Sequence, residues 1–156
     1  MNLNSSEMIS HRKMNLNDLF LIYNWRNEKK VIKNSLSKKK ITLNEHKTWF
    51  NKIMKSANHL SLIFSFNREE FGLVRFFLYN NSAEINYLIC EKFRGKRLSK
   101  LMLIQSINFL FSRHEIKKIF AKVLRNNIIS SKILEDINFE QLDINDDYTN
   151  YILKTK

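Results

Sequence analysis

The sequence is poor in the residues that interrupt or cross-link a chain. Its 156 residues include two glycines, one cysteine and no proline. Average chains carry about 7% glycine and about 5% proline, so this scarcity excludes collagen-like chains, glycine-rich linkers and proline-rich segments. It also argues against two domains joined by a flexible tether. Because one domain usually takes about 100–200 residues, we expect residues 1–156 to form a single domain.

The single cysteine, Cys90, excludes two classes of site. It has no partner for an internal disulfide, and it cannot form a cysteine-rich zinc site. A chain without disulfides fits a reducing compartment, so the predicted location is the cytoplasm. The histidines show no metal-ligand spacing, and no metal site is expected. They are His11, His46, His59 and His114.

Long apolar runs are missing as well. The first residues are polar and contain no apolar segment typical of a signal peptide. The longest apolar runs, 60–66 and 71–79, are much shorter than the roughly 18 residues that cross a membrane. The sequence therefore predicts neither a signal peptide nor a membrane helix, and no membrane partner.

Negative charge is scarce. The chain has 27 lysines and arginines against 15 aspartates and glutamates, which gives a net charge of +12. Such an excess suggests an anionic partner. A second explanation stays open, because lysine, asparagine, isoleucine and phenylalanine are abundant together, as AT-rich codon usage produces.

The apolar spacing predicts alternating helices and strands. Asn17 or Asp18 is placed to cap a first helix over 19–26, and Thr42 with Glu45 forms a capping-box pattern ahead of a second. Turn residues divide the middle of the chain into an antiparallel meander. This order predicts an α+β fold with a mixed, mostly antiparallel sheet. The other predicted elements are strands 8–12, 60–66, 71–79, 84–90 and 117–124, a loop with a short helix over 29–40, helices 98–111 and 130–137, and a closing hairpin of 139–144 and 148–153.

The segment 93–100 joins a predicted strand to a predicted helix and is rich in positive charge. A turn at such a junction points backbone N–H groups and a helix N-terminus at one place, which attracts phosphate. Two interpretations remain open for this segment alone: a phosphate-binding loop, or a solvated basic loop that begins a helix. Its basic residues are Arg94, Lys96, Arg97 and Lys100.

A second junction favours the first interpretation. Residues 123–139 follow the next predicted strand and contain Asn127, Ser130 and Phe139. Together the two segments resemble the GNAT family of acetyl-CoA-dependent N-acetyltransferases. Arg94 matches the first position of that family's Arg/Gln-x-x-Gly-x-Gly/Ala loop, and the Asn-x-x-Ser spacing and the later phenylalanine match its next helix. The order of elements agrees over nearly the whole chain, which implies a GNAT-like fold with helices on both faces of the sheet.

The resemblance also implies acetyl-CoA as the acetyl donor. In this family the loop binds pyrophosphate, and the end of the fourth strand offers backbone hydrogen bonds to pantetheine. Cys90 itself is interpreted as a small apolar filler rather than a nucleophile. The residues implied to bind the cofactor are Leu88, Ile89, Cys90, Arg94, Gly95, Lys96, Arg97, Leu98, Ser99, Lys100, Asn127 and Ser130.

The chain departs from the family pattern at several positions. Arg97 and Ser99 stand where the loop usually has glycine, so their backbone would bind pyrophosphate only with near-helical φ angles. Asn138 replaces the glycine before Phe139 and tolerates a positive φ. Leu134 replaces the tyrosine that protonates the leaving thiolate in most members, so another group or water would supply this proton.

Amine acetylation needs a general base, because an ammonium has no lone pair. Residues 83–90 resemble the Ala-Glu-hydrophobic pattern of the histone acetyltransferase branch, which implies Glu84 as the catalytic base. Glu84, Asn86 and Leu88 would share one face of a strand. A free glutamate has a pKa of about 4.3, so burial would have to raise it. The alternative is an edge carboxylate paired with a lysine.

The N-terminal third is expected to select the acceptor. Its segments 23–27 and 45–50 resemble the branch that acetylates UDP-4-amino-sugars, as in pseudaminic acid synthesis. The resemblance implies a nucleotide-linked amino sugar as substrate, with arginine suited to the diphosphate and an aromatic ring to uracil. The aromatic residues would equally serve as core, and the histidine as a surface residue. The residues expected to bind the substrate on this resemblance are Arg26, Asn27, His46 and Trp49. Arg75, inside the third predicted strand, is a further candidate, with two roles open: to reach the cleft or to cap a buried carboxylate.

Two other classes of function stay open. One is acetylation of a protein N-terminus or lysine, including the ribosomal-protein type, with the basic stretch 29–40 facing an acidic partner. The other is a non-enzymatic basic binding module, because lysines are dense between 29 and 55. No nucleic-acid motif accompanies them, and the acidic stretch 135–147 would interrupt a basic groove, so no nucleic acid is expected. A homodimer is common in the resembled branch.

Overall fold

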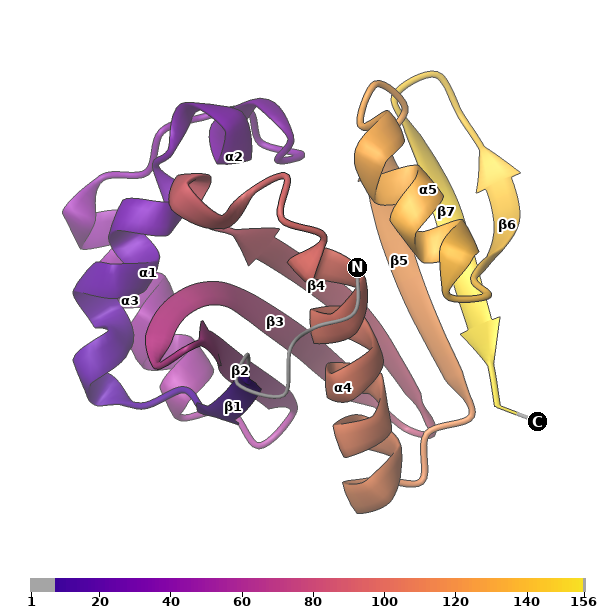
Figure 1. Cartoon of the computed structure of the whole chain (residues 1–156), viewed down its shortest axis with the longest axis horizontal. Helices are drawn as coiled ribbons and strands as arrows, with labels where there is room; N and C mark the ends of the chain where they lie inside the picture. Colours follow the sequence, from indigo (N-terminus) through magenta and orange to yellow (C-terminus); the bar gives the residue numbers. More distant parts are fainter. Residues whose placement is uncertain (1–7, 156) are drawn as a thin grey trace.

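The computed structural model describes residues 8–155 and shows a seven-stranded sheet with the strand order β1-β2-β3-β4-β5-β7-β6 (Figure 1). The strands are β1 (Ile9–Lys13), β2 (His59–Phe66), β3 (Glu69–Tyr79), β4 (Ser82–Ile89), β5 (Lys118–Leu124), β6 (Glu140–Ile144) and β7 (Tyr148–Lys154). The helices are α1 (Leu19–Arg26), α2 (Lys29–Lys33), α3 (Leu43–Met54), α4 (Leu98–Arg113) and α5 (Ile128–Asp136), with short 3-10 turns at Leu16–Asp18 and Glu91–Phe93.

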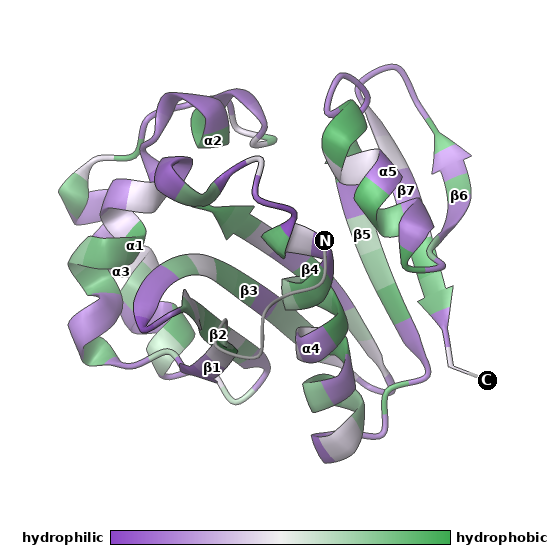
Figure 2. Ribbon diagram, in the orientation of Figure 1, coloured by the Kyte–Doolittle hydropathy of each residue, from purple (hydrophilic) through white to green (hydrophobic). Residues whose placement is uncertain are grey.

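The predicted fold class is confirmed. Strands β2, β3 and β4 form an antiparallel meander, and of the paired strands only β4 and β5 run parallel within the described chain. The α4 helix makes the crossover between these two, as a parallel pair requires. Figure 2 shows hydrophobic residues along the central strands and mostly hydrophilic residues on the loops.

The two parallel strands pair over only half of their length. Residues Ser82–Ile85 of β4 pair with Lys118–Ala121 of β5, but β4 continues to Ile89 and β5 to Leu124. Figure 1 shows the two strands diverging beyond the paired end. The last half of β4 therefore presents backbone groups that β5 does not use.

The sheet separates two groups of helices. A Cβ atom built on Gly72 of β3 would lie 2.6 Å from the Met102 sulfur, so α4 packs against this face. Arg75 points to the opposite face, where its guanidinium lies 5.0 Å from the Trp49 ring centroid of α3. The cross-strand pairs assign Tyr87 to the α4 face and Glu84 to the α3 face.

Two helix starts test the capping predictions. Thr42 and Glu45 form the predicted capping box at α3. The predicted caps of α1 are wrong, because neither Asn17 nor Asp18 caps it with its side chain; Asn15 caps the 3-10 turn instead. Asp18 turns to Arg12, which donates two hydrogen bonds of 2.8 and 2.7 Å. Such charge-assisted bonds are stronger than a bond to one backbone N–H.

Candidate active site

The loop after β4 offers unpaired backbone donors beside a helix N-terminus. A 3-10 turn ends at Phe93, Gly95 has a φ of +75°, and α4 begins at Leu98 without a side-chain cap. Within the described chain, the N–H groups of residues 95–97 bond to no backbone or side-chain acceptor. The first turn of any α-helix adds further open N–H groups. This arrangement suits an anion with several oxygen atoms.

Arg97 does not meet the condition of a near-helical φ. It lies at φ +60° and ψ +19°, in the left-handed region, immediately before α4. This is the geometry that a glycine adopts without strain, which explains why the loop pattern has glycine there. Ser99, by contrast, lies inside α4 with a helical backbone, and its side chain costs the loop nothing.

The Arg94 side chain is bonded to protein groups. Its guanidinium pairs with Glu28, between α1 and α2, and its Nε donates to the Ile89 carbonyl oxygen at 3.0 Å. Glu28 also accepts from the Glu91 backbone N–H at 3.1 Å. Arg94 thus ties the loop to the α1–α2 corner, while its role toward a cofactor stays a prediction.

The divergent end of β4 lies beside the first turn of α5. Asn127 caps this helix by accepting from the Ser130 backbone N–H, and its Nδ2 donates to Ser130 Oγ at 3.0 Å. The Tyr87 hydroxyl of β4 donates to the same oxygen, also at 3.0 Å. Sequence reasoning singled out Asn127 and Ser130 but missed Tyr87. The sequence signal was Leu134 at the family's usual tyrosine position, which left open whether another group or water supplies the proton.

Cys90 is buried at the end of β4, and burial raises the pKa of its thiol. A thiol that resists ionisation is a poor nucleophile, which agrees with its interpretation as an apolar filler. The Leu88 and Ile89 positions lie on the part of β4 that β5 leaves unpaired. Their backbone groups are therefore placed where an extended, amide-containing ligand would add to the sheet edge.

Glu84 lies on the α3 face of β4 and is exposed. The burial on which its activation as a base depends is therefore absent in the free protein. Its negative charge favours the charged form of the nearby Arg75. No described lysine pairs with it, so the alternative of an edge carboxylate in a lysine ion pair receives no support.

Two arginines on the α3 face each have a buried nitrogen atom without a hydrogen-bond partner among residues 8–155. Arg75 Nη2 donates to Asn86 Oδ1 at 2.7 Å, but its Nε has no partner. Arg26 Nη2 donates to Ser37 Oγ at 3.0 Å, but its Nη1 has none. Burial and the charge of Arg26 lower the pKa of Arg75 to about 10. Two cations that repel each other without a carboxylate partner form a site prepared for an anion.

Two of the other predicted substrate residues, His46 and Asn27, are bonded within the N-terminal third. His46 is 1% exposed, contacts the Leu19 carbonyl oxygen through Nε2 at 2.8 Å and packs against Tyr23. Burial lowers its pKa, so it stays neutral at physiological pH. The Asn27 amide exchanges two hydrogen bonds with the Ile41 backbone. Both residues position α1 and the following loop, and any ligand contact by them stays a prediction.

A family model described as an acetyltransferase (GNAT) domain matches residues 11–140. This chain belongs to the GNAT family. The acetyltransferase therefore uses acetyl-CoA as donor and an amine as acceptor. None of the proteins with curated descriptions matches its sequence.

Solved structures share the fold at low identity. A domain from Methanocaldococcus jannaschii DSM 2661 is 24% identical with a TM-score of 0.83, over 96% of this chain and 99% of that one. The spermidine N-acetyltransferase from Vibrio cholerae, solved with CoA and spermine, is 18% identical with a TM-score of 0.83, over 97% and 96%. The N-acetyltransferase PseH from Campylobacter jejuni, solved with acetyl coenzyme A, is 17% identical with a TM-score of 0.75, over 96% and 100%.

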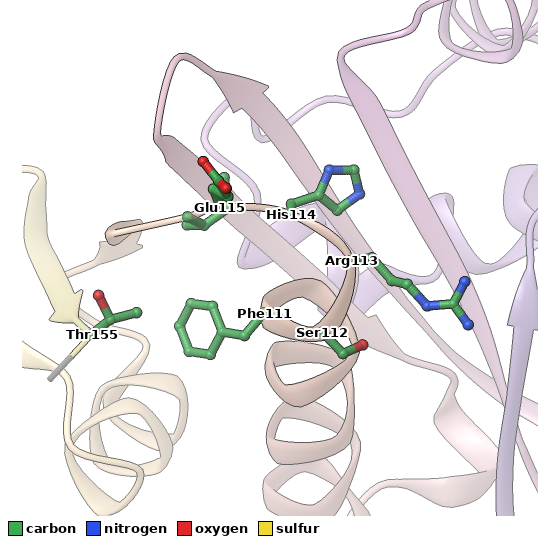
Figure 3. Close-up of a pocket in the computed structure, with 7 residues that line it drawn as sticks. Phe111, Ser112, Arg113, His114, Glu115 and Thr155 are labelled. Atoms are coloured by element: carbon green, nitrogen blue, oxygen red, sulfur yellow. The ribbon is translucent and has the colours of Figure 1, made fainter.

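Two surface hollows of the acetyltransferase lie elsewhere. Figure 3 shows one, formed by the last turn of α4, the turn 114–116 and Thr155. The other lies between α1, the start of β3 and the end of β4, and three of its glutamates already pair with cations: Glu28, Glu69 and Glu70. Neither hollow includes Glu84 or the N-terminus of α4.

Within residues 8–155, no three histidine, cysteine, aspartate or glutamate side chains are grouped to hold a metal ion. No helix in this part of the chain has the length and apolar character to cross a bilayer.

Proposed function

We propose that this acetyltransferase acetylates the primary amine of a nucleotide-linked amino sugar. The observation that carries the proposal is the buried nitrogen atom without a partner in each of two half-buried arginines of the described chain, Arg26 and Arg75. Buried polar groups usually have partners, and an exception calls for an explanation. A diphosphate supplies several acceptor oxygens with negative charge, which arginine binds better than any other side chain does.

The same face of the sheet supports a placement of the reacting amine. Asn86, which accepts from Arg75, lies two residues after Glu84 on β4 and points to the same side. An acceptor whose phosphates bind the two arginines extends toward Glu84 with its sugar. The carboxylate then takes a proton from the ammonium, directly or through water. When the acceptor binds, it covers the Glu84 carboxylate and excludes water from it, which the free protein does not do.

The donor is proposed to bind at the other end of β4. Its pyrophosphate accepts from the open N–H groups before α4, with Lys96, Arg97 and Lys100 nearby, and its pantetheine extends along residues 88–90. Asn127 and Ser130 are proposed to contact it from α5. The thioester then reaches the point where β4 and β5 begin to pair, next to Glu84.

Cationic acceptors fit this site poorly. A polyamine would bring positive charge against Arg26 and Arg75, and like charges repel strongly where water is excluded. A peptide N-terminus adds a single positive charge and lacks the phosphates that would occupy the two guanidinium groups. The anionic acceptor is therefore favoured over both.

A thiol-release assay with matched acceptors tests the proposal. We expect turnover on UDP- or dTDP-linked amino sugars and little on spermidine or on peptides; turnover on peptides alone would overturn the sugar assignment. Thermal unfolding with acetyl-CoA comes first, because a ligand of the native state raises the melting temperature. No shift at millimolar acetyl-CoA would contradict the proposed donor site.

Three variants test the proposed roles of Glu84 and Arg75. Glu84→Gln should lower turnover on the best acceptor about a hundredfold if Glu84 is the base. Arg75→Met should raise KM for a nucleotide-linked acceptor and leave KM for acetyl-CoA unchanged. Arg113→Met is the matched control, because Arg113 also stacks on an aromatic ring, Phe109, at 5.4 Å, but at the far end of α4. If Arg75→Met and Arg113→Met changed KM for the nucleotide-linked acceptor equally, Arg75 would not belong to the acceptor site.

A further inference from the structure

The Tyr87 hydroxyl joins β4 to α5. Tyr87 is two residues beyond Ile85, the last residue of β4 that pairs with β5, and it faces α5. Its hydroxyl donates to Ser130 Oγ, which also accepts from Asn127 Nδ2. Because Ser130 Oγ accepts both bonds, the hydroxyl hydrogen of Ser130 remains available to donate. The tyrosine thus has a mobile proton and a neighbour that can stabilise its phenolate.

The position of Tyr87 matches the reacting end of the donor. Pyrophosphate and thioester are at opposite ends of pantetheine. If the pyrophosphate binds before α4, pantetheine runs back along the unpaired half of β4, and the thioester arrives near residues 85–87. The family's usual proton donor is absent there, because Leu134 has no hydroxyl and is 0% exposed.

We propose that Tyr87 is the general acid that protonates the leaving CoA thiolate. This rests on the proposed placement of the donor and not on the identity of the acceptor. The amine nitrogen forms a bond to the thioester carbon, and the C–S bond then breaks with its electron pair on sulfur. The Tyr87 hydroxyl transfers its proton to that sulfur, so CoA leaves as a thiol. The phenolate accepts a hydrogen bond from Ser130 and regains a proton from water, while Glu84 passes the amine proton to water.

The two catalytic groups then lie on opposite faces of one strand. Glu84 points to the α3 face, from which the amine approaches, and Tyr87 points to the face of α4 and α5. Burial raises the pKa of Tyr87, which keeps the hydroxyl protonated at neutral pH. A protonated hydroxyl is the form that a general acid requires. Base and acid therefore stay apart and do not neutralise each other.

Tyr87→Phe tests this role, with Tyr151→Phe as the matched control. Tyr151 also bonds α5 through its hydroxyl, at 3.2 Å from Glu135, but lies on β7. We expect Tyr87→Phe to lower kcat about a hundredfold, within the range of general acid catalysis, with KM for acetyl-CoA changed less than about threefold. Tyr151→Phe should keep kcat within about threefold of the wild type.

A donor with selenium in place of sulfur distinguishes the loss of a proton donor from a structural defect in Tyr87→Phe. A selenolate leaves without prior protonation at neutral pH, so acetyl-seleno-CoA should restore most of the rate that Tyr87→Phe loses with acetyl-CoA. The ratio of the two rates is independent of the folded fraction of each variant, so a destabilised variant is still informative. An equal defect with both donors would overturn the proposal, as would an unchanged kcat with acetyl-CoA. Failure of wild-type enzyme on every amine would instead contradict the proposed function.

Discussion

Arg97 adopts a backbone conformation that residues with side chains rarely adopt. Its φ of +60° belongs to the left-handed region, which costs a residue with a side chain about 1–2 kcal/mol. Asn138 also has a positive φ, of +68°, but asparagine tolerates this region well. Strain of this kind persists at functional sites, where the surrounding structure holds it. Here it lies directly before α4, beside N–H groups of residues 95–97 that have no acceptor within the described chain.

Arg97→Gly should make the protein more stable. Glycine removes the left-handed strain but loses about 0.5–1 kcal/mol of chain entropy, so we expect a net gain of about 0.5–1 kcal/mol in the free energy of unfolding. Denaturant unfolding measures it. Arg97→Ala is the control, because it removes the same charge and keeps the strain. Equal stability of the two variants would show that the backbone carries no strain at this position.

At the scale of whole elements, the distance between α4 and β3 depends on Gly72. A Cβ atom there would lie 2.6 Å from the Met102 sulfur and 3.2 Å from the Leu88 carbonyl oxygen. Both separations are too short, and Leu88 belongs to the part of β4 proposed to bind pantetheine. The one glycine of β3 thus lets α4 bring its open N-terminus close to this strand end.

Gly72→Ala should destabilise the protein by about 1–3 kcal/mol, as overpacking does. In a Met102→Ala background most of this cost should vanish, because the nearest clashing atom is gone. Gly95→Ala is the control: nothing lies within 4 Å of its Cβ position, but its φ is +75°. Its cost should be the same in both backgrounds. Thermal unfolding measures each alanine substitution in the wild type and in Met102→Ala, together with these two parent proteins. If Gly72→Ala costs as much stability in Met102→Ala as in the wild type, the packing argument is contradicted.

The elements themselves follow from the sequence more closely than the site does. The capping box at Thr42 and the meander were predicted because they rest on local patterns. The pairing of Arg94 with Glu28 and the position of Tyr87 over Ser130 were not predictable, since each joins residues distant in the sequence. The cap of α1 failed for another reason, because β1 supplies Arg12 as a stronger partner for Asp18.

For the molecule as a whole, the net charge of +12 means that its carboxylates stabilise the fold by offsetting repulsion among the cations. The described ion pairs use acidic residues to join elements: Glu28 holds the loop before α4, and Glu69 pairs with Lys92. Asp18 and Glu70 share Arg12, which joins β1 to the start of α1 and to β3. Acid removes these attractions and increases the repulsion among the cations. We therefore expect the protein to lose stability at acidic pH.

Asp18 should account for a measurable part of that loss. Burial alone would raise its pKa, but the hydrogen bonds from Arg12 and the Asn15 backbone N–H outweigh this and hold the pKa below its ordinary value. A lowered pKa in the folded state contributes stability above the unfolded pKa of about 3.9, and this contribution is lost as pH falls toward the folded pKa. Asp18→Asn should cost about 2 kcal/mol at pH 6. Denaturant unfolding between pH 6 and pH 3 should show this gap to the wild type closing.

The exposed Asp146 provides the control for this pH series, because no described side chain bonds to its carboxylate. Asp146→Asn should follow the wild type at every pH, since a solvated carboxylate contributes little to folding. General repulsion among the cations acts on all three proteins alike, so it cancels in the differences between them. A gap between Asp18→Asn and the wild type that stayed constant down to pH 3 would mean that the shape of Asp18, and not its charge, stabilises the junction of β1 and α1.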